Sequence, residues 1–265
     1  MRRVALIVAI CGGIGACGAA NGQGAISGTT GADKLASTTL CADSYALALA
    51  PERAVALSWQ AGTPLSTVSA DDPRPRIDAD AETLFGRSDT VLTGPGGPNP
   101  RGAVTIAWGE DFGAVLHNIE ALERVLDVDG SGLRADLDSL SALPRPARAP
   151  RILYLSRGGG SAGAGTYVDA AIRAAGGVNA AQGTGWHTPS VEAVLQLDPD
   201  IVLTSFFGSD YHGANDRAVR HGALRRFIEG RPRIDVPGKL WPCAGPGLIE
   251  ATQLINAGIM AWDGA

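Results

Sequence analysis

The feature that most constrains the fold is a repeated strand–helix–strand unit. In the second copy, the short apolar run at 151–156 ends at Arg157 and a cluster of glycines, which predicts a buried strand that enters a loop. Apolar residues at helical spacing follow from Thr166, and another apolar run at 201–204 predicts a second buried strand. Two buried strands that flank a helix indicate a parallel crossover.

An earlier part of the chain matches this unit. A large side chain follows a serine at the end of the first strand in both copies. The aligned segments are 54–59 with the strand ending at Arg157, 81–84 with 191–194, and 89–93 with 200–204. Such a repeat predicts two similar units in tandem. The expected fold class is therefore α/β, with two Rossmann-like lobes built on mostly parallel central sheets.

The length of the chain suits two domains of ordinary size. It has 265 residues, of which 45% are hydrophobic, enough to bury two cores. A helical pattern from Leu133 to Leu143 lies between the two units and is expected to bridge them. The predicted organisation is a signal peptide at 1–20, a flexible tether at 21–34, an N-terminal α/β lobe at 35–128, an interlobe helix and linker at 129–149, and a C-terminal α/β lobe at 150–265.

The first residues predict export. Arg2 and Arg3 precede an apolar run at 4–10 and then small residues, a pattern typical of a secretory signal and too short to span a bilayer. Two forms of processing remain open. The sequence before Cys17 resembles a bacterial lipobox, which would place a lipid on that cysteine, whereas the small residues after it suit cleavage before Asn21.

Charge and histidine placement exclude two classes of partner. The net charge is -5, and no basic cluster is interleaved with aromatic residues, so nucleic acid is not expected to bind. His117 lies on a predicted helix of the first unit, while His187, His212 and His221 all lie in the second, an arrangement that does not favour a metal site shared by two lobes. We expect neither a bound metal nor a resident cofactor.

Four segments of the chain together carry a family resemblance. They are 37–43 and 241–246 near the two ends, and 166–181 and 190–203 in the second unit. As a set they are similar to the class III periplasmic binding proteins, the solute-binding subunits of ABC importers for ferric siderophores, haem and cobalamin.

The resemblance implies a non-enzymatic protein of the periplasm. It implies two α/β lobes joined by one rigid helix, a ligand held between the lobes, and delivery of that ligand to an ABC permease in the inner membrane. We also expect a monomer. The family docks on its permease through one acidic side chain from each lobe, but the corresponding regions here are rich in Pro and Gly or in Arg, so docking residues are not assigned.

Cys41 and Cys243 are predicted to form a disulfide. They are the only cysteines left after removal of the leader, the compartment of an exported protein is oxidising, and both residues follow candidate strands. The alternative is a pair of buried free thiols, since a free cysteine behaves as a small hydrophobic residue.

The predicted ligand site lies beyond the carboxyl ends of the parallel strands, where open α/β sheets bind their ligands. Trp59 and Arg157 occupy that place in the two aligned units and are expected to face each other. Trp186 lies in a glycine-flanked loop, and Trp241 ends a predicted edge strand. The alternative for each tryptophan is a place in a lobe core. The residues predicted to contact a cobalamin, haem or ferric siderophore are Ser58, Trp59, Gly96, Arg157, Trp186, Phe206 and Trp241.

A secreted hydrolase is the alternative function. Residues 159–163 match the Gly-x-Ser-x-Gly pattern of α/β hydrolases, with Ser161 as the nucleophile. That motif requires a sharp turn from a strand into a helix, whereas the helix here is expected to begin only near Thr166. A flexible glycine loop is the better interpretation of this segment.

Overall fold

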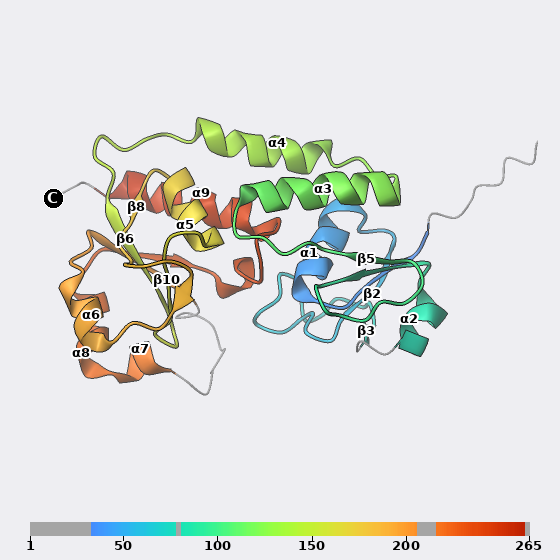
Figure 1. Ribbon diagram of the computed structural model, residues 1–265, viewed down its shortest axis with the longest axis horizontal. Helices are drawn as coiled ribbons and strands as arrows, with labels where there is room; N and C mark the ends of the chain where they lie inside the picture. The colour runs from blue at the N-terminus through green and yellow to red at the C-terminus, as the bar shows by residue number, and fades with distance from the viewer. Residues whose placement is uncertain (1–32, 78–80, 206–215, 263–265) are drawn as a thin grey trace, which may run out of the picture. The chain divides into compact units, whose positions relative to one another are not determined.

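Two parallel β-sheets, each with helices packed on its faces, form the part of the chain that the computed structural model describes, residues 33–77, 81–205 and 216–262 (Figure 1). The first sheet has five strands in the order β3-β2-β1-β4-β5. All its pairings are parallel. We call this sheet and its helices the first lobe. Its strands are β1 (Leu35–Ser37), β2 (Ala54–Ser58), β3 (Arg76–Ile77), β4 (Thr90–Thr93) and β5 (Ala103–Thr105).

The second sheet has four parallel strands in the order β11-β10-β6-β8 and belongs to the second lobe. Its strands are β6 (Arg151–Ser156), β8 (Val178–Asn179), β10 (Ile201–Ser205) and β11 (Arg233–Val236). A separate antiparallel pair is formed by β7 (Ser161–Ala162) and β9 (Trp186–His187). The predicted α/β class with two mostly parallel sheets is confirmed.

The two sheets repeat one strand order, but one of the three segment pairs in the sequence alignment of the repeat is wrong. β1 corresponds to β6, β2 to β8, β4 to β10 and β5 to β11, while β3 is an additional edge strand. The alignment of 89–93 with 200–204 therefore pairs true counterparts. The alignment of 54–59 with the strand ending at Arg157 is wrong, because it pairs β2 with β6. Arg157 follows β6, so its counterpart in the first lobe follows β1.

Side-chain caps set the start of four helices. Thr39, Asp111, Thr166 and Ser190 each accept a hydrogen bond from a backbone N–H three residues later. The helices of the first lobe are α1 (Leu40–Leu49), α2 (Ala81–Arg87) and α3 (Phe112–Leu126). Those of the second lobe are α5 (Tyr167–Ala174), α6 (Val191–Gln196), α7 (Arg217–Arg220), α8 (Gly222–Glu229) and α9 (Gly247–Ala261).

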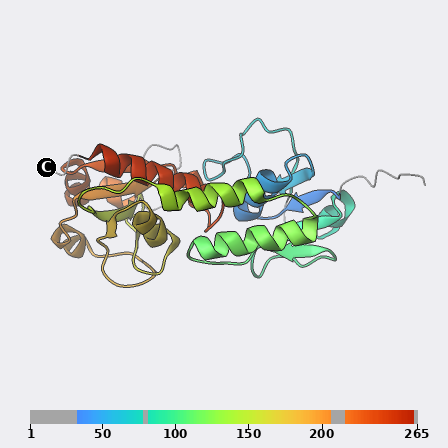
Figure 2. The same ribbon diagram turned by 90° about the horizontal axis from the view of Figure 1, so that it is seen from above.

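The connection between the lobes is a helix packed along α3, followed by an extended segment. Helix α4 (Ser131–Ser139) continues into the short 3₁₀ helix η1 (Leu140–Ala142), and α4 lies beside α3 in both views (Figures 1 and 2). Glu123 of α3 forms an ion pair with Arg134 of α4. The Nδ2 of Asn256 donates to the carbonyl oxygens of Pro144 and Ala175, each at 2.9 Å, which fixes the extended segment on α9.

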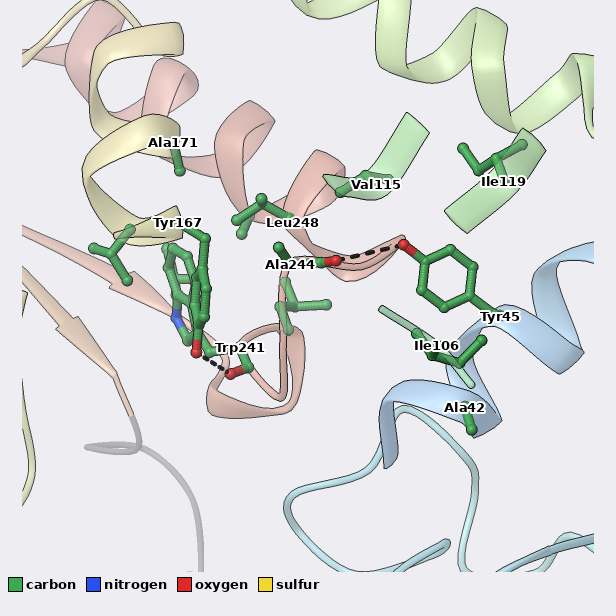
Figure 3. Close-up of a cluster of buried hydrophobic side chains, with 14 of the residues drawn as sticks. Ala42, Tyr45, Ile106, Val115, Ile119, Tyr167, Ala171, Trp241, Ala244 and Leu248 are labelled. Atoms are coloured by element: carbon green, nitrogen blue, oxygen red, sulfur yellow. Dashed lines mark hydrogen bonds between the residues drawn. The ribbon is translucent and has the colours of Figure 1, made fainter. Parts of the chain in front are cut away.

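One continuous hydrophobic core includes side chains of both lobes (Figure 3). The Tyr45 hydroxyl of α1 lies 3.4 Å from the carbonyl oxygen of Ala244, and the Tyr167 hydroxyl of α5 donates to the carbonyl oxygen of Trp241 at 2.9 Å. The segment that enters α9 is therefore packed between α1 and α5. Because this segment comes from the end of the chain, the lobes are joined by contacts far apart in sequence as well as by α4.

Two predicted elements differ in the structure. The predicted edge strand at 239–241 is the 3₁₀ helix η2 (Gly238–Leu240), because Pro237 and Pro242 on either side lack the N–H groups that a strand would use. The sequence at 216–229 predicts one arginine-rich helix, whereas the structure divides this stretch into α7 and α8 at His221. The predicted leader, tether and Cys17 lie outside the described residues. No helix in the described part of the chain is long and apolar enough to cross a membrane.

Candidate ligand-binding site

A pocket of about 460 Å³ lies at the carboxyl ends of β1, β4 and β5. Its walls come from the loops that follow these strands and β2, from the start of α1 and from the segment after η2. Among the described residues that line it none is charged. The lining residues are Thr39, Leu40, Cys41, Gln60, Gly94, Pro95, Ile106, Ala107, Trp108, Gly109, Pro242, Cys243 and Ala244. This is the place at which open α/β sheets bind their ligands.

A disulfide forms part of the pocket wall. The sulfur atoms of Cys41 and Cys243 are 2.13 Å apart and their Cα atoms 5.9 Å apart. Cys41 lies in the first turn of α1, and Cys243 lies in the segment that enters α9. The disulfide therefore links the start of the first lobe covalently to the end of the second lobe.

Trp108 is an exposed indole on this wall, with 60% of its surface accessible. The backbone just before it is held by Asn118 of α3, which is buried: the Asn118 Oδ1 accepts from the N–H of Ala107 at 2.8 Å, and its Nδ2 donates to the carbonyl oxygen of Ala107 at 3.0 Å. An apolar side chain that is exposed on a fixed backbone offers a preformed surface to a ligand.

Glu110 connects this wall to the second lobe. Its carboxylate accepts hydrogen bonds from the Trp108 Nε1 at 3.1 Å, the Trp186 Nε1 at 3.4 Å and the backbone N–H of Tyr167 at 3.2 Å. Tyr167 is the first residue of α5, so a negative charge here is also stabilised by the helix dipole. We call Trp108, Glu110, Tyr167 and Trp186 the Glu110 clasp.

A second, smaller pocket of about 290 Å³ lies in the second lobe beside Trp186. The Trp186 ring is 4.9 Å from the Tyr167 ring and 6.4 Å from the Tyr154 ring, measured between centroids. Burial raises the pKa of the Tyr154 phenol to about 12 and also raises the pKa of the Tyr167 phenol, so both stay protonated at neutral pH. The lining residues are Tyr154, Ser156, Gly160, Ser161, Trp186, His187 and Thr188.

The predicted tryptophans fall into two groups. Trp59 is 60% exposed and Trp186 is 45% exposed, as expected for side chains that meet a ligand; Trp186 lines the second pocket, and Gln60, next to Trp59, lines the first. Trp241 is only 6% exposed and packs against Tyr154 and Tyr167. For Trp241 the alternative of a core side chain therefore describes the structure, since η2 turns it inward (Figure 3).

Arg157 has a partner within its own lobe. Its Nε donates to the Oδ1 of Asp216 at 2.8 Å, and both side chains are largely buried. The expectation that Arg157 faces Trp59 followed from the pairing of β2 with β6, and the strand order removes that basis. The pair instead fixes the loop after β6 against the start of α7.

The three remaining predicted residues do not extend the pocket lining. Ser58 is buried and its hydroxyl donates to the Oδ2 of Asp43 at 2.6 Å, so it has a structural role at the end of β2. Gly96 is exposed at a positive φ of 73° in the loop after β4, where Gly94 and Pro95 line the pocket. Phe206 lies outside the described residues.

The geometry around Ser161 does not suit a nucleophile. Ser161 is buried on β7, and its Oγ donates to the carbonyl oxygen of Tyr154 at 2.8 Å. No sharp turn from a strand into a helix carries it, and α5 begins only at Tyr167. His117 and His221 are exposed, while His212 lies outside the described residues. The described part of the chain holds no group of three or more His, Cys, Asp or Glu that could bind a metal.

The fold and this pocket define the class to which the structure is similar. No protein-family model and no curated protein matches the sequence. The solved structures that match are class III periplasmic binding proteins, and the chain has their fold.

Three of these structures illustrate the similarity. The haem-binding protein HutB of Vibrio cholerae matches with a TM-score of 0.68 and 19% identity, over 84% of this chain and 97% of its own. The haem-binding protein RhuT from Roseiflexus sp. RS-1 matches with a TM-score of 0.61 and 21% identity, over 86% and 100%. The vitamin B12 binding protein BtuF of Vibrio cholerae matches with a TM-score of 0.59 and 16% identity, over 87% and 98%.

Trp108 and Glu110 were missed as site residues by the sequence reasoning, although a signal for them existed. Both lie just after a predicted strand at 103–107, and the rule that selected Trp59 as the residue after a strand applies equally to Trp108. The part that Glu110 plays could not be inferred, because Trp186 is 76 residues away in sequence and only the folded chain brings the two together.

Proposed function

We propose that the protein is the solute-binding component of an ABC importer and that it delivers a large ligand with a flat face to a permease in the inner membrane. The observation that carries this proposal is the pocket at the carboxyl ends of the first-lobe strands, with exposed indoles near it from both lobes. Indoles that remain exposed on fixed backbone are suited to the faces of a macrocycle or an aromatic chelate.

The ligand class follows from the chemistry of the lining. The first pocket is apolar and uncharged, and Trp59, Trp108 and Trp186 together offer more flat aromatic surface than a sugar or an amino acid would use. Cobalamin, haem and ferric siderophores fit this description, and the similar structures include proteins for haem and vitamin B12. We place the protein in the periplasm as a monomer, with Cys17 as the residue for a lipid anchor.

The direct test is to identify what the protein carries. Freshly purified protein should show the absorbance of a bound corrin, haem or ferric chelate, and its native mass should exceed the chain mass by that of the ligand. Titration of stripped protein with haemin, cyanocobalamin and a ferric catecholate siderophore should quench tryptophan fluorescence for at least one of them. Absence of binding for all three would contradict the proposal.

Trp59→Ala and Trp186→Ala are each expected to weaken binding of that ligand at least tenfold, about 1.4 kcal/mol, because each removes a large apolar contact surface. Isothermal titration would measure the dissociation constants. Trp262→Ala is the matched control, since Trp262 lies under the guanidinium of Arg148 at 4.6 Å and away from both pockets. Unchanged affinity in both of the first two variants would refute the site.

A further inference from the structure

We propose that Glu110 selects the ligand by charge: its carboxylate holds the indoles of Trp108 and Trp186 in position and keeps negatively charged groups out of the space that these indoles border. This inference deepens the proposed function and rests on it for the identity of the ligand. The electrostatic part can be tested without any ligand. The consequence is a preference for a flat ligand whose rim is uncharged.

The position of the carboxylate is set by three donors from two lobes. Trp108 donates to the Oε1 of Glu110 at 3.1 Å, and the Trp186 Nε1 lies 3.4 Å from both carboxylate oxygens. The backbone N–H of Tyr167 donates to the Oε2 at 3.2 Å. Hydrogen bonds to a charged acceptor are stronger than those between neutral groups, so the carboxylate is held between the N–H groups of the two indoles.

Each indole has a second support besides the carboxylate. Asn118 holds the backbone before Trp108 by two hydrogen bonds to Ala107, and the Tyr167 ring packs at 4.9 Å from the Trp186 ring. Each indole is therefore fixed by its backbone or ring neighbour at one end and by Glu110 at its N–H. Loss of the carboxylate would free the rings to rotate, which makes Glu110 a positioning residue for both.

Glu110 lacks an ion-pair partner among the residues that the structure describes. None of the ion pairs between described residues includes Glu110, and neither pocket is lined by a lysine or an arginine. The guanidinium of Arg157, one of the residues predicted to contact the ligand, is paired with Asp216. Burial raises the pKa of the Tyr154 phenol, which lines the second pocket.

A carboxylate without an ion-pair partner repels ligand anions that come close to it, and the repulsion is stronger at a protein surface than in bulk water because the effective dielectric constant is lower there. A tetrapyrrole with free carboxylates on its rim would bring like charges close to Glu110. A tetrapyrrole with amides or esters on its rim would not bring like charges close to Glu110, and the N–H groups of rim amides could donate to the carboxylate. The clasp therefore favours neutral rims over anionic ones.

The ligand-independent test uses charged and neutral quenchers of fluorescence. In a background of Trp59→Phe and Trp262→Phe, the exposed emitters are Trp108 and Trp186, since Trp241 is buried and the chain has five tryptophans. At fixed low ionic strength, Glu110→Gln should increase the quenching constant for iodide by about twofold while that for neutral acrylamide stays the same. Glu120→Gln, at an exposed position of α3, is the control of equal charge change.

Two results would overturn the charge selection in this test. One is an iodide constant that does not change in Glu110→Gln. The other is an equal rise for iodide and acrylamide, which would indicate greater exposure of the rings and no electrostatic effect. Glu110→Ala should in addition increase acrylamide quenching, because it removes the acceptor that holds both indoles.

The second test measures binding of haemin, its dimethyl ester and cyanocobalamin. The wild type should bind the ester more tightly than haemin. Glu110→Gln should lower the ratio of the haemin dissociation constant to the ester dissociation constant about tenfold, by improving haemin binding alone. A ratio that is the same in both proteins would overturn the proposal. If none of the three ligands binds, the proposed function fails for tetrapyrroles, while the quenching experiment still decides whether Glu110 excludes anions.

Discussion

Replacement of both Cys41 and Cys243 by alanine is expected to lower the free energy of unfolding by about 3 to 4 kcal/mol. The disulfide closes a loop with a sequence separation of 202, so it strongly restricts the unfolded chain. It also attaches the start of α1 to the segment that enters α9. Among the described residues of these two segments, the only hydrogen bond that joins them is the one between Tyr45 and Ala244. Without the disulfide, packing alone would hold this wall of the pocket.

Urea unfolding followed by far-UV circular dichroism measures this effect. The variant should have a lower midpoint and a larger dependence on urea, because its unfolded state exposes more surface. Wild-type protein in excess reductant is the control and should approach the variant, whereas reductant should leave the variant unchanged. Equal midpoints for oxidised wild type and variant would contradict the prediction, as would two titratable thiols in unfolded, unreduced protein.

The architecture could be predicted from the sequence because parallel strands buried on both faces give continuous apolar runs, as at 151–156 and 201–204. The correspondence between the strands of the two sheets could not be predicted from the sequence. β1 is the central strand of its sheet but has only three residues, so the candidate strand at 35–40 is too short an apolar run to align with the one at 151–156. The more visible β2 was therefore matched to β6, and the error moved Arg157 opposite Trp59.

Site residues that follow the ends of strands were predicted from the sequence, and site residues that depend on packing in the folded chain were missed. Trp186 was predicted as a ligand contact from its glycine-flanked loop, and the structure places Glu110 of the first lobe beside it. Trp241 was predicted to end an edge strand, whereas its segment forms the 3₁₀ helix η2 and the indole is buried. Contacts such as those of Glu110 join residues distant in sequence, and no local pattern indicates them.

Asp43→Ala is expected to lower the free energy of unfolding by about 3 kcal/mol, because it leaves buried donors without an acceptor. Asp43 is buried on α1, where it accepts hydrogen bonds from the Ser37 hydroxyl, the Ser58 hydroxyl at 2.6 Å and the Ser58 N–H at 2.9 Å. One carboxylate thus joins the helix to the carboxyl ends of β1 and β2. Trp59 follows directly, so its backbone depends on this contact.

A series of variants separates this role from a general effect of charge. Asp43→Asn keeps the size of the side chain but points an amide donor toward hydroxyl donors, so we expect a loss smaller than that of Asp43→Ala. Ser58→Ala should have a smaller effect still, because its backbone N–H remains paired with Asp43. Asp136→Ala on the exposed face of α4 is the control for removal of a carboxylate. A urea midpoint for Asp43→Ala equal to that of Asp136→Ala would show that the three hydrogen bonds do not hold the strand ends, and the position of Trp59 would then need another explanation.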